Sequence, residues 1–178
     1  MPRLFTGIEI PSEIVIGLSA LRGGIPGARW VEPENYHLSL RFIGDVDDAT
    51  GREIMQILGG VRRRAFELAF DGIGQFGGRK PRAVFAAANP RPALIELQAE
   101  HDRLLQRMGL PPDARKYTPH VTLARLRDVT AHRVADYLSS RGPYRSPPFQ
   151  VSRFVLFSSR ASVGGGPYVV ESAYPLDA

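Results

Sequence analysis

Two ten-residue segments of the chain resemble each other, and this repeat constrains the fold more than any other feature. Residues 37–46 read HLSLRFIGDV and residues 120–129 read HVTLARLRDV, an offset of 120 − 37 = 83 residues. Each segment starts with His, alternates polar and apolar residues as a strand does, and precedes a predicted helix. A repeat of this kind predicts two lobes that are related by a pseudo-two-fold axis, with the two strands facing each other.

Predicted strands and helices alternate along the chain, and several strands follow one another through short turns. Ser12 and either Asp47 or Asp48 are the expected helix N-caps. This pattern predicts the α+β class, with one bilobal domain over residues 1–178 built from mainly antiparallel sheets flanked by helices. The expected strands are 3–10, 36–43, 66–70, 82–88, 120–126, 149–158 and 168–174, the helices 12–21, 47–64, 92–108 and 130–140, the glycine-rich loop 71–81, and the last connection Gly164-Gly165-Gly166.

The composition excludes several kinds of site. The chain has no Cys, which excludes disulfides, thiolate metal sites and a Cys nucleophile, and fits a reducing cytoplasm. Its apolar runs are short, so we expect no membrane span and no secretory signal peptide. The net charge is +5, and 21 of the 23 basic residues are Arg, whose planar fork suits phosphate oxygens. Genome base composition produces the same bias, so the charge permits a nucleic-acid partner without requiring one.

The two repeated strands carry the candidate chemistry. Residues i and i+2 of a strand share a face, so His37 lies beside Ser39, and His120 lies beside Thr122. If the lobes face each other, the cleft between them holds two imidazoles and two hydroxyls around one point. A phosphate fits this arrangement, because one neutral His takes a proton from water while the other, charged, gives a proton to the leaving oxygen.

Two His-x-[Ser/Thr]-x motifs in a chain of this length resemble the two-histidine (2H) phosphoesterase superfamily. The closer similarity is to the bacterial and archaeal RNA 2′,3′-cyclic phosphodiesterases, which are also called 2′-5′ RNA ligases or LigT-like proteins. The segments that carry the resemblance are Arg3-Leu4-Phe5, Arg29-Trp30-Val31, residues 35–46, residues 119–125 and residues 154–160.

This resemblance implies a bilobal fold with the active site in the central cleft and with no metal or other cofactor. It implies hydrolysis of an RNA terminal 2′,3′-cyclic phosphate to a 2′-phosphate, with reverse 2′-5′ ligation as a side activity. By the family pattern, His37 is the proton donor and His120 the acceptor. Ser39, Thr122 and Arg125 would bind the phosphate oxygens. RNA 3′ ends or nucleotides with a cyclic phosphate are the implied partners, and we expect a cytoplasmic monomer without membrane contact.

Two details of the motifs leave questions open. Ser39 stands where the family more often has Thr. Ser keeps the hydroxyl but lacks the methyl group that stiffens χ1. Strict alternation places Arg125 on the face opposite His120, so the strand must end, twist or bulge near Ala124 for Arg125 to reach a phosphate. By the same alternation Arg41 lies on the active face and is a rival contact, whereas Leu38, Leu40 and Phe42 point into the core.

Other signals have simpler interpretations. Gly72-x-Gly74-x-x-Gly77 matches a dinucleotide fingerprint, but residues 78–81 block the helix that such a site needs, so we expect a loop that helps to bind RNA. His101 should be packed in the protein and His132 solvated. Arg62-Arg63-Arg64 closes a predicted helix, and a solvated helix end is as good an interpretation as RNA contact. Arg115-Lys116-Tyr117 either guides a phosphodiester with a stacking ring or is a plain surface loop.

Three functions therefore remain open. The first is a metal-free phosphodiesterase acting on RNA cyclic phosphate ends. The second keeps the fold and chemistry but acts on small cyclic nucleotides or 2′-5′-linked oligonucleotides. The third is a non-catalytic module that binds RNA ends.

Overall fold

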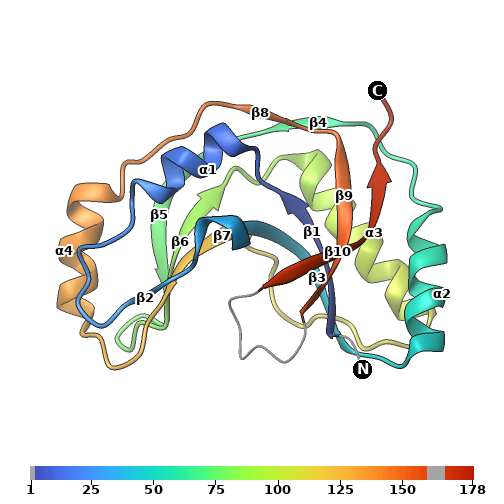
Figure 1. The fold of residues 1–178 in the computed structure, drawn as a ribbon, viewed down its shortest axis with the longest axis horizontal. Coiled ribbons are helices and arrows are strands. Elements are labelled where there is room, and N and C mark those ends of the chain that lie inside the picture. The colour runs from blue at the N-terminus through green and yellow to red at the C-terminus, as the bar shows by residue number, and fades with distance from the viewer. Residues whose placement is uncertain (1–2, 160–166) are drawn as a thin grey trace.

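Two four-stranded antiparallel sheets form the two lobes of the molecule and converge at its centre (Figure 1). The computed structural model describes residues 3–159 and 167–178. The first sheet has the order β10-β9-β1-β3, with β1 at Arg3–Glu9, β3 at His37–Asp45, β9 at Arg153–Ser159 and β10 at Tyr168–Pro175. The second has the order β2-β7-β6-β5, with β2 at Arg29–Trp30, β5 at Phe70–Phe76, β6 at Ala83–Ala88 and β7 at His120–Arg125.

In the part of the chain that the structure describes, a small third sheet, four α-helices and the short 3-10 helix Pro33–Asn35 accompany these sheets. Strands β4 (Phe66–Leu68) and β8 (Phe149–Val151) pair across the top of both lobes in Figure 1. Helices α2 (Asp48–Leu58) and α3 (Pro92–Arg107) flank the first sheet, and α1 (Ser12–Ser19) and α4 (Ala131–Arg141) lie beside the second. The predicted antiparallel, bilobal α+β architecture is confirmed.

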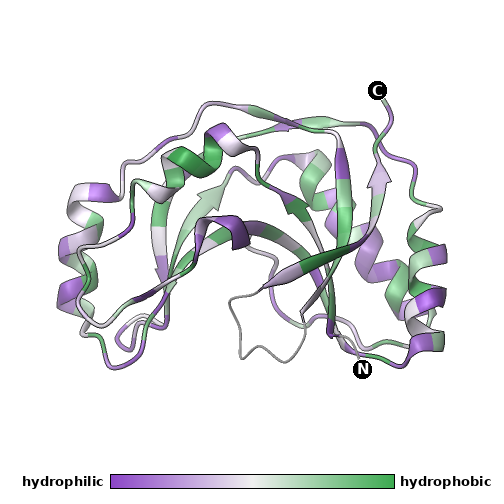
Figure 2. Cartoon of the chain, viewed as in Figure 1, coloured by the Kyte–Doolittle hydropathy of each residue, from purple (hydrophilic) through white to green (hydrophobic). Residues whose placement is uncertain are grey.

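The helices pack through one apolar side, as Figure 2 shows by their alternating green and purple faces. Helix α3 buries Leu94, Leu97, His101 and Leu105, whose spacings of three, four and four residues define a single helix face. Of the two predicted N-caps of α2, Asp47 and Asp48, Asp47 is the one observed, because its carboxylate accepts the Thr50 backbone N–H at 2.7 Å. One continuous hydrophobic core joins these faces to both sheets.

Three sequence expectations about elements are wrong. Pro11, not Ser12, is the N-cap of α1, and it makes no side-chain cap bond. Helix α2 ends at Leu58, where Gly59-Gly60 follows, rather than continuing to residue 64. The expected loop 71–81 is mostly strand β5, which pairs with β6. Glycine is required within it at Gly74, where a Cβ would lie 2.7 Å from the Phe85 ring.

Two further expectations concern other parts of the chain. Gly164-Gly165-Gly166 and Arg160 lie outside the described residues. Within the described ranges, none of the helices has the length and apolar character that crossing a membrane requires.

Each repeated strand contains a β-bulge at the same place. In β3, Thr6 pairs with Arg41 and Gly7 with Ser39, so Leu40 is an extra residue without a partner. In β7, Val84 pairs with Ala124 and Phe85 with Thr122, so Leu123 is the extra residue. Leu40 and Leu123 are both the third residue after the motif His. A bulge shifts the alternation by one, so the side chains beyond it change faces.

Candidate active site

His37 begins β3 and is held by its two ring nitrogens. Nδ1 lies 2.9 Å from the Asn35 carbonyl oxygen, and Nε2 lies 3.1 Å from the Ser39 hydroxyl. A carbonyl only accepts hydrogen bonds, so Nδ1 carries a proton and donates it. The neutral ring then has its lone pair on Nε2, which accepts from Ser39. Period-2 geometry therefore places the His and the hydroxyl together, as the sequence predicted.

His120 begins β7 and repeats the first half of this arrangement. Its Nδ1 lies 2.6 Å from the Thr118 carbonyl oxygen, again two residues earlier in the chain. This bond fixes the same tautomer, so Nε2 is the nitrogen available for proton transfer in both lobes. The repeat thus conserves the orientation of the imidazole as well as its position on the strand.

Aromatic rings surround both imidazoles and lower their pKa values. The His37 ring contacts Tyr168, Phe5 and Phe157 at centroid distances of 4.7, 5.0 and 5.6 Å. This burial lowers the pKa of His37 from 6.5 to about 4, against the raising effect of the Asn35 carbonyl, and the nearby charges of His120 and Arg125 lower it further.

His120 has a less complete aromatic shell. Its ring contacts Phe76 at 4.9 Å and Phe85 at 5.3 Å. Burial lowers the pKa of His120 as well, and its bond to the Thr118 carbonyl opposes that effect. Both imidazoles are therefore neutral at pH 7 in the ligand-free protein.

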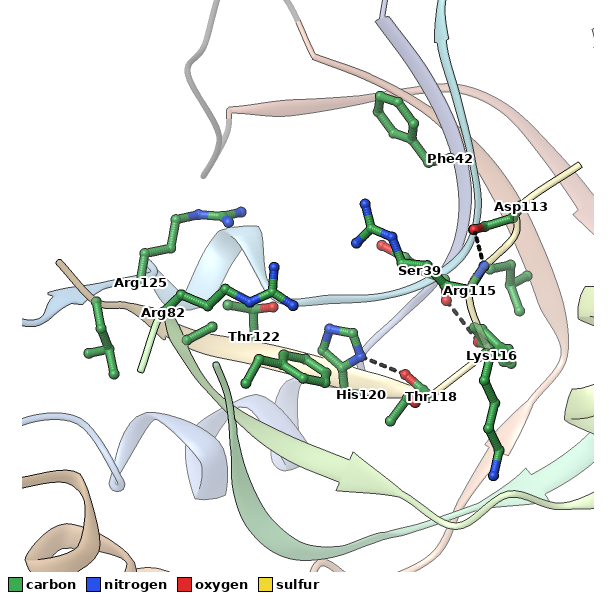
Figure 3. A pocket seen from close by; sticks show the side chains of 15 residues that line it. Ser39, Phe42, Arg82, Asp113, Arg115, Lys116, Thr118, His120, Thr122 and Arg125 are labelled. Atoms are coloured by element: carbon green, nitrogen blue, oxygen red, sulfur yellow. Dashed lines mark hydrogen bonds between the residues drawn. The ribbon is translucent and has the colours of Figure 1, made fainter. Parts of the chain in front are cut away.

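The cleft between the lobes consists of two cavities that meet at three residues. The larger, of about 610 Å³, contains His120 and Thr122, and the smaller, of about 210 Å³, contains His37. Ser39, Phe42 and Arg125 line both cavities. Figure 3 shows His120 near the middle of the larger cavity, with Arg125 and Arg82 on one side and Arg115 on the other. The structure thus brings all five predicted site residues to one cleft.

The bulges decide which Arg faces the cleft. Leu123 and Ala124 are both buried, so Arg125 returns to the face of His120 and lines the cleft. Leu40 and Arg41 are likewise both on the buried side, so the prediction that strand alternation places the rival Arg41 on the active face is wrong. Arg41 is 7% exposed, and its Nε donates to Asp102 Oδ1 at 2.8 Å.

The bulge also brings Phe42 into the cleft, where the sequence interpretation placed it in the core. Its side chain is 56% exposed and lines both cavities. Phe42 and Arg125 are each the fifth residue after their motif His, so aligning the repeat beyond the alternation would have revealed Phe42. Tyr117, for which the sequence left open a stacking ring or a plain surface loop, donates its hydroxyl to the Ser39 carbonyl oxygen at 2.8 Å, and burial raises its pKa.

The other residues that the sequence singled out, namely His101, His132, the arginine run and the three glycines of the fingerprint, do not line the two cavities. His101 is buried, as expected, with Nδ1 2.9 Å from the Thr6 hydroxyl, and the side chain of His132 is 85% exposed. Arg63 pairs with Glu96 and Glu100 after α2 has ended, so the arginine run does not close a helix. Strand β6, not a helix, follows the glycine motif, which does not form a dinucleotide site. Among the described residues, no three His, Cys, Asp or Glu side chains form a group suited to a metal ion.

Known proteins resemble this chain in sequence and in fold. A family model described as LigT like Phosphoesterase matches residues 8–86 and again residues 84–168, one match for each repeat. An RNA 2′,3′-cyclic phosphodiesterase of Geobacillus stearothermophilus is 30% identical over 180 residues, which cover 97% of this chain and 56% of that protein. One of Aeropyrum pernix is 36% identical over 106 residues, or 58% of this chain and 60% of that protein. The chain thus spans less than two thirds of these two relatives.

Solved structures have a similar fold over nearly the whole chain. The crystal structure of Escherichia coli LigT complexed with 3′-AMP has a TM-score of 0.80 and 27% identity, and the match covers 99% of both chains. A crystal structure described as a phosphoesterase has a TM-score of 0.83 at 27% identity, again over 99% of both chains. With the family model matching both halves, the chain belongs to the LigT-like phosphoesterase family.

Proposed function

We propose that the protein hydrolyses RNA terminal 2′,3′-cyclic phosphates to 2′-phosphates, with His37 and His120 as the acid–base pair. The observation that carries this proposal is the pair of equivalent imidazoles, each held through Nδ1 with Nε2 available for proton transfer, at one cleft. The name RNA 2′,3′-cyclic phosphodiesterase, which the relatives carry, supports it.

The proposed reaction is an in-line displacement at phosphorus. His120 Nε2 takes a proton from water, whose oxygen forms the new bond to phosphorus. The bond from phosphorus to O3′ breaks, and His37 Nε2 gives its proton to the departing O3′. The product is a 2′-phosphate with a free 3′-hydroxyl, and a proton exchange with solvent resets the two imidazoles.

His37 acquires the proton for this step together with the substrate. In the free cleft the pKa of His37 is about 4, so the ring is neutral near pH 7. The anionic phosphate favours the charged imidazolium and raises that pKa when it binds. Ser39 then gives up its bond to Nε2 and donates its hydroxyl to a phosphate oxygen instead.

The other cleft residues hold the phosphate and the base. Thr122 donates a hydroxyl to a non-bridging oxygen, and Arg125 adds a charge-assisted hydrogen bond. The exposed ring of Phe42, at the junction of the two cavities, offers a flat apolar surface on which a nucleobase stacks. We propose that no metal takes part, because the two imidazoles and these donors supply every proton transfer and charge contact in this scheme.

The same groups also perform the reverse type of reaction, 2′-5′ ligation. A 5′-hydroxyl of a second RNA strand replaces the water, and His120 takes its proton. O3′ leaves as before, so the product is a 2′-5′ phosphodiester.

The test is cleavage of 2′,3′-cyclic CMP in the presence of EDTA, with identification of the product. We expect turnover in EDTA and a 2′-phosphate, whereas a 3′-phosphate product would refute the proposed reaction. His37→Ala and His120→Ala should each lower kcat by about 10²–10⁴-fold, which is the usual contribution of a general acid or base. His132→Ala, which changes an exposed imidazole on α4, is the matched control and should keep full activity. Binding without turnover would indicate a non-catalytic RNA-end-binding module.

A further inference from the structure

The larger cavity carries more positive charge than one phosphate requires. Four cationic side chains and one carboxylate line it. Arg125 lies at the junction with the smaller cavity and serves the reacting phosphate in the proposed function. Arg115 and Lys116 lie in the segment between α3 and β7, and Figure 3 places them across His120 from Arg125 and Arg82. We call Arg115 and Lys116 the basic arm.

The segment that carries the basic arm is anchored at both ends. At its start, the buried Arg41 guanidinium donates to the Pro111 carbonyl oxygen while it is paired with Asp102. At its end, the Tyr117 hydroxyl donates to the Ser39 carbonyl oxygen at 2.8 Å. These bonds fix the basic arm to β3 and α3, so little conformational entropy is lost when it binds a ligand.

The charges of the basic arm are available to a ligand. In the part of the chain that the structure describes, neither side chain forms an ion pair. Asp113, the carboxylate that lines the same cavity, accepts the backbone N–H of Arg115 at 3.1 Å, and its own backbone N–H donates to Asp102. The guanidinium of Arg115 points into the cavity in Figure 3. An anchored cation without an acidic partner is suited to a second anion.

Resting on the proposed function, we infer that the basic arm binds the phosphodiester on the 5′ side of the terminal nucleoside. The cavity of about 610 Å³ extends from the reacting phosphate past His120 to Arg115. A single-stranded RNA carries its next negative charge one nucleotide away, whereas a cyclic mononucleotide has none. The preferred substrate is therefore the end of an RNA strand rather than a free cyclic mononucleotide.

The experiment compares 2′,3′-cyclic CMP with a trinucleotide that ends in the same cyclic cytidine. We expect the wild-type protein to prefer the trinucleotide by about tenfold or more in kcat/KM, because one charge-assisted phosphate contact is worth roughly that much. The variant Arg115→Gln/Lys116→Gln should remove this preference. Its kcat/KM for the trinucleotide should also depend less steeply on salt, by about 0.7 in the log–log slope per lost phosphate contact.

The matched control is Arg52→Gln/Arg133→Gln, which removes two exposed charges from α2 and α4 and should keep the preference. The inference is overturned if the wild-type protein treats both substrates alike, or if the basic-arm variant and the control lose the preference equally. If neither substrate is cleaved, the proposed function fails first, and binding of a fluorescent trinucleotide 2′-phosphate then tests the basic arm. A tenfold weaker Kd in the basic-arm variant supports it, and an unchanged Kd refutes it.

Discussion

The proposed pair of imidazoles predicts that kcat/KM is highest on the acid side of neutrality. The reactive free protein carries one proton, on His37, and a neutral His120. The pKa of His37 is about 4. At pH 7 the charged fraction of His37 is therefore about 10⁻³, so only about one molecule in a thousand is in this form. The fraction falls tenfold for each further pH unit. At low pH, protonation of His120 removes the base, so the maximum lies between two pKa values that are both below 6.5.

The assay is the hydrolysis of 2′,3′-cyclic CMP between pH 4 and 9 at constant ionic strength. The profile of kcat/KM reports the free protein, and the profile of kcat reports the complex. We expect kcat/KM to fall about tenfold per pH unit above neutrality. The fall in kcat should begin at higher pH, because the bound phosphate raises the pKa of His37. A value of kcat/KM that is flat or rising between pH 6.5 and 8.5 would refute this reasoning.

A variant in the aromatic shell tests the physical cause of that profile. Tyr168 contacts the His37 ring at 4.7 Å, so Tyr168→Ser admits water and raises the pKa of His37 toward 6.5. The alkaline fall in kcat/KM should then begin at higher pH. Val169→Ser changes an exposed neighbour on the same strand and should leave the profile in place. If both variants keep the wild-type profile, desolvation by the aromatic shell does not control His37.

Three further changes test other parts of the site. A substrate in which sulfur replaces O3′ needs no general acid, because a thiolate is a better leaving group than an alkoxide. This substrate should therefore restore turnover to His37→Ala but not to His120→Ala. If it restores turnover to His120→Ala instead, the assigned roles of acid and base are reversed. Arg125→Gln should lower kcat/KM by about tenfold to a hundredfold, the value of a hydrogen bond to a charged group, in steady-state assays. Arg41→Met should lower the free energy of unfolding in urea by about 1–3 kcal/mol, because it removes the cation paired with the half-buried Asp102 and the donor to the Pro111 carbonyl. An unchanged free energy of unfolding would show that these contacts of Arg41 do not stabilise the fold.

The sequence predicts the site as far as strand alternation holds. His37 with Ser39 and His120 with Thr122 follow from period-2 geometry, and the structure places each pair on the cleft. Alternation fails after the third residue of each motif, which is why Arg41 and Phe42 were placed on the wrong faces. A bulge depends on how the strand pairs with its neighbour, β1 or β6, and that pairing is not visible in the periodicity of one strand.

The glycine-rich stretch from Asp71 shows a second limit of sequence reasoning. Glycines typically indicate loops, and residues 78–81, which block a following helix, favoured that interpretation over a dinucleotide site. In the structure Gly74 lies in a strand, because the ring of Phe85 occupies the space of its side chain. That ring in turn contacts His120 at 5.3 Å. Gly74 therefore makes room for the Phe85 ring, which packs against His120. This packing joins residues far apart in the chain, and the local composition does not reveal it.

The two lobes have the same bulged strand but present different side chains to the cleft. The same bulge presents Phe42 in one lobe and Arg125 in the other, so one cleft receives both a surface for a base and a charge for a phosphate. The aromatic shells differ in the same way, with three rings against His37 and two against His120. The fuller shell around His37 disfavours its charged form in the free cleft. The bound phosphate must therefore supply the attraction that lets His37 hold the proton at the moment of bond cleavage.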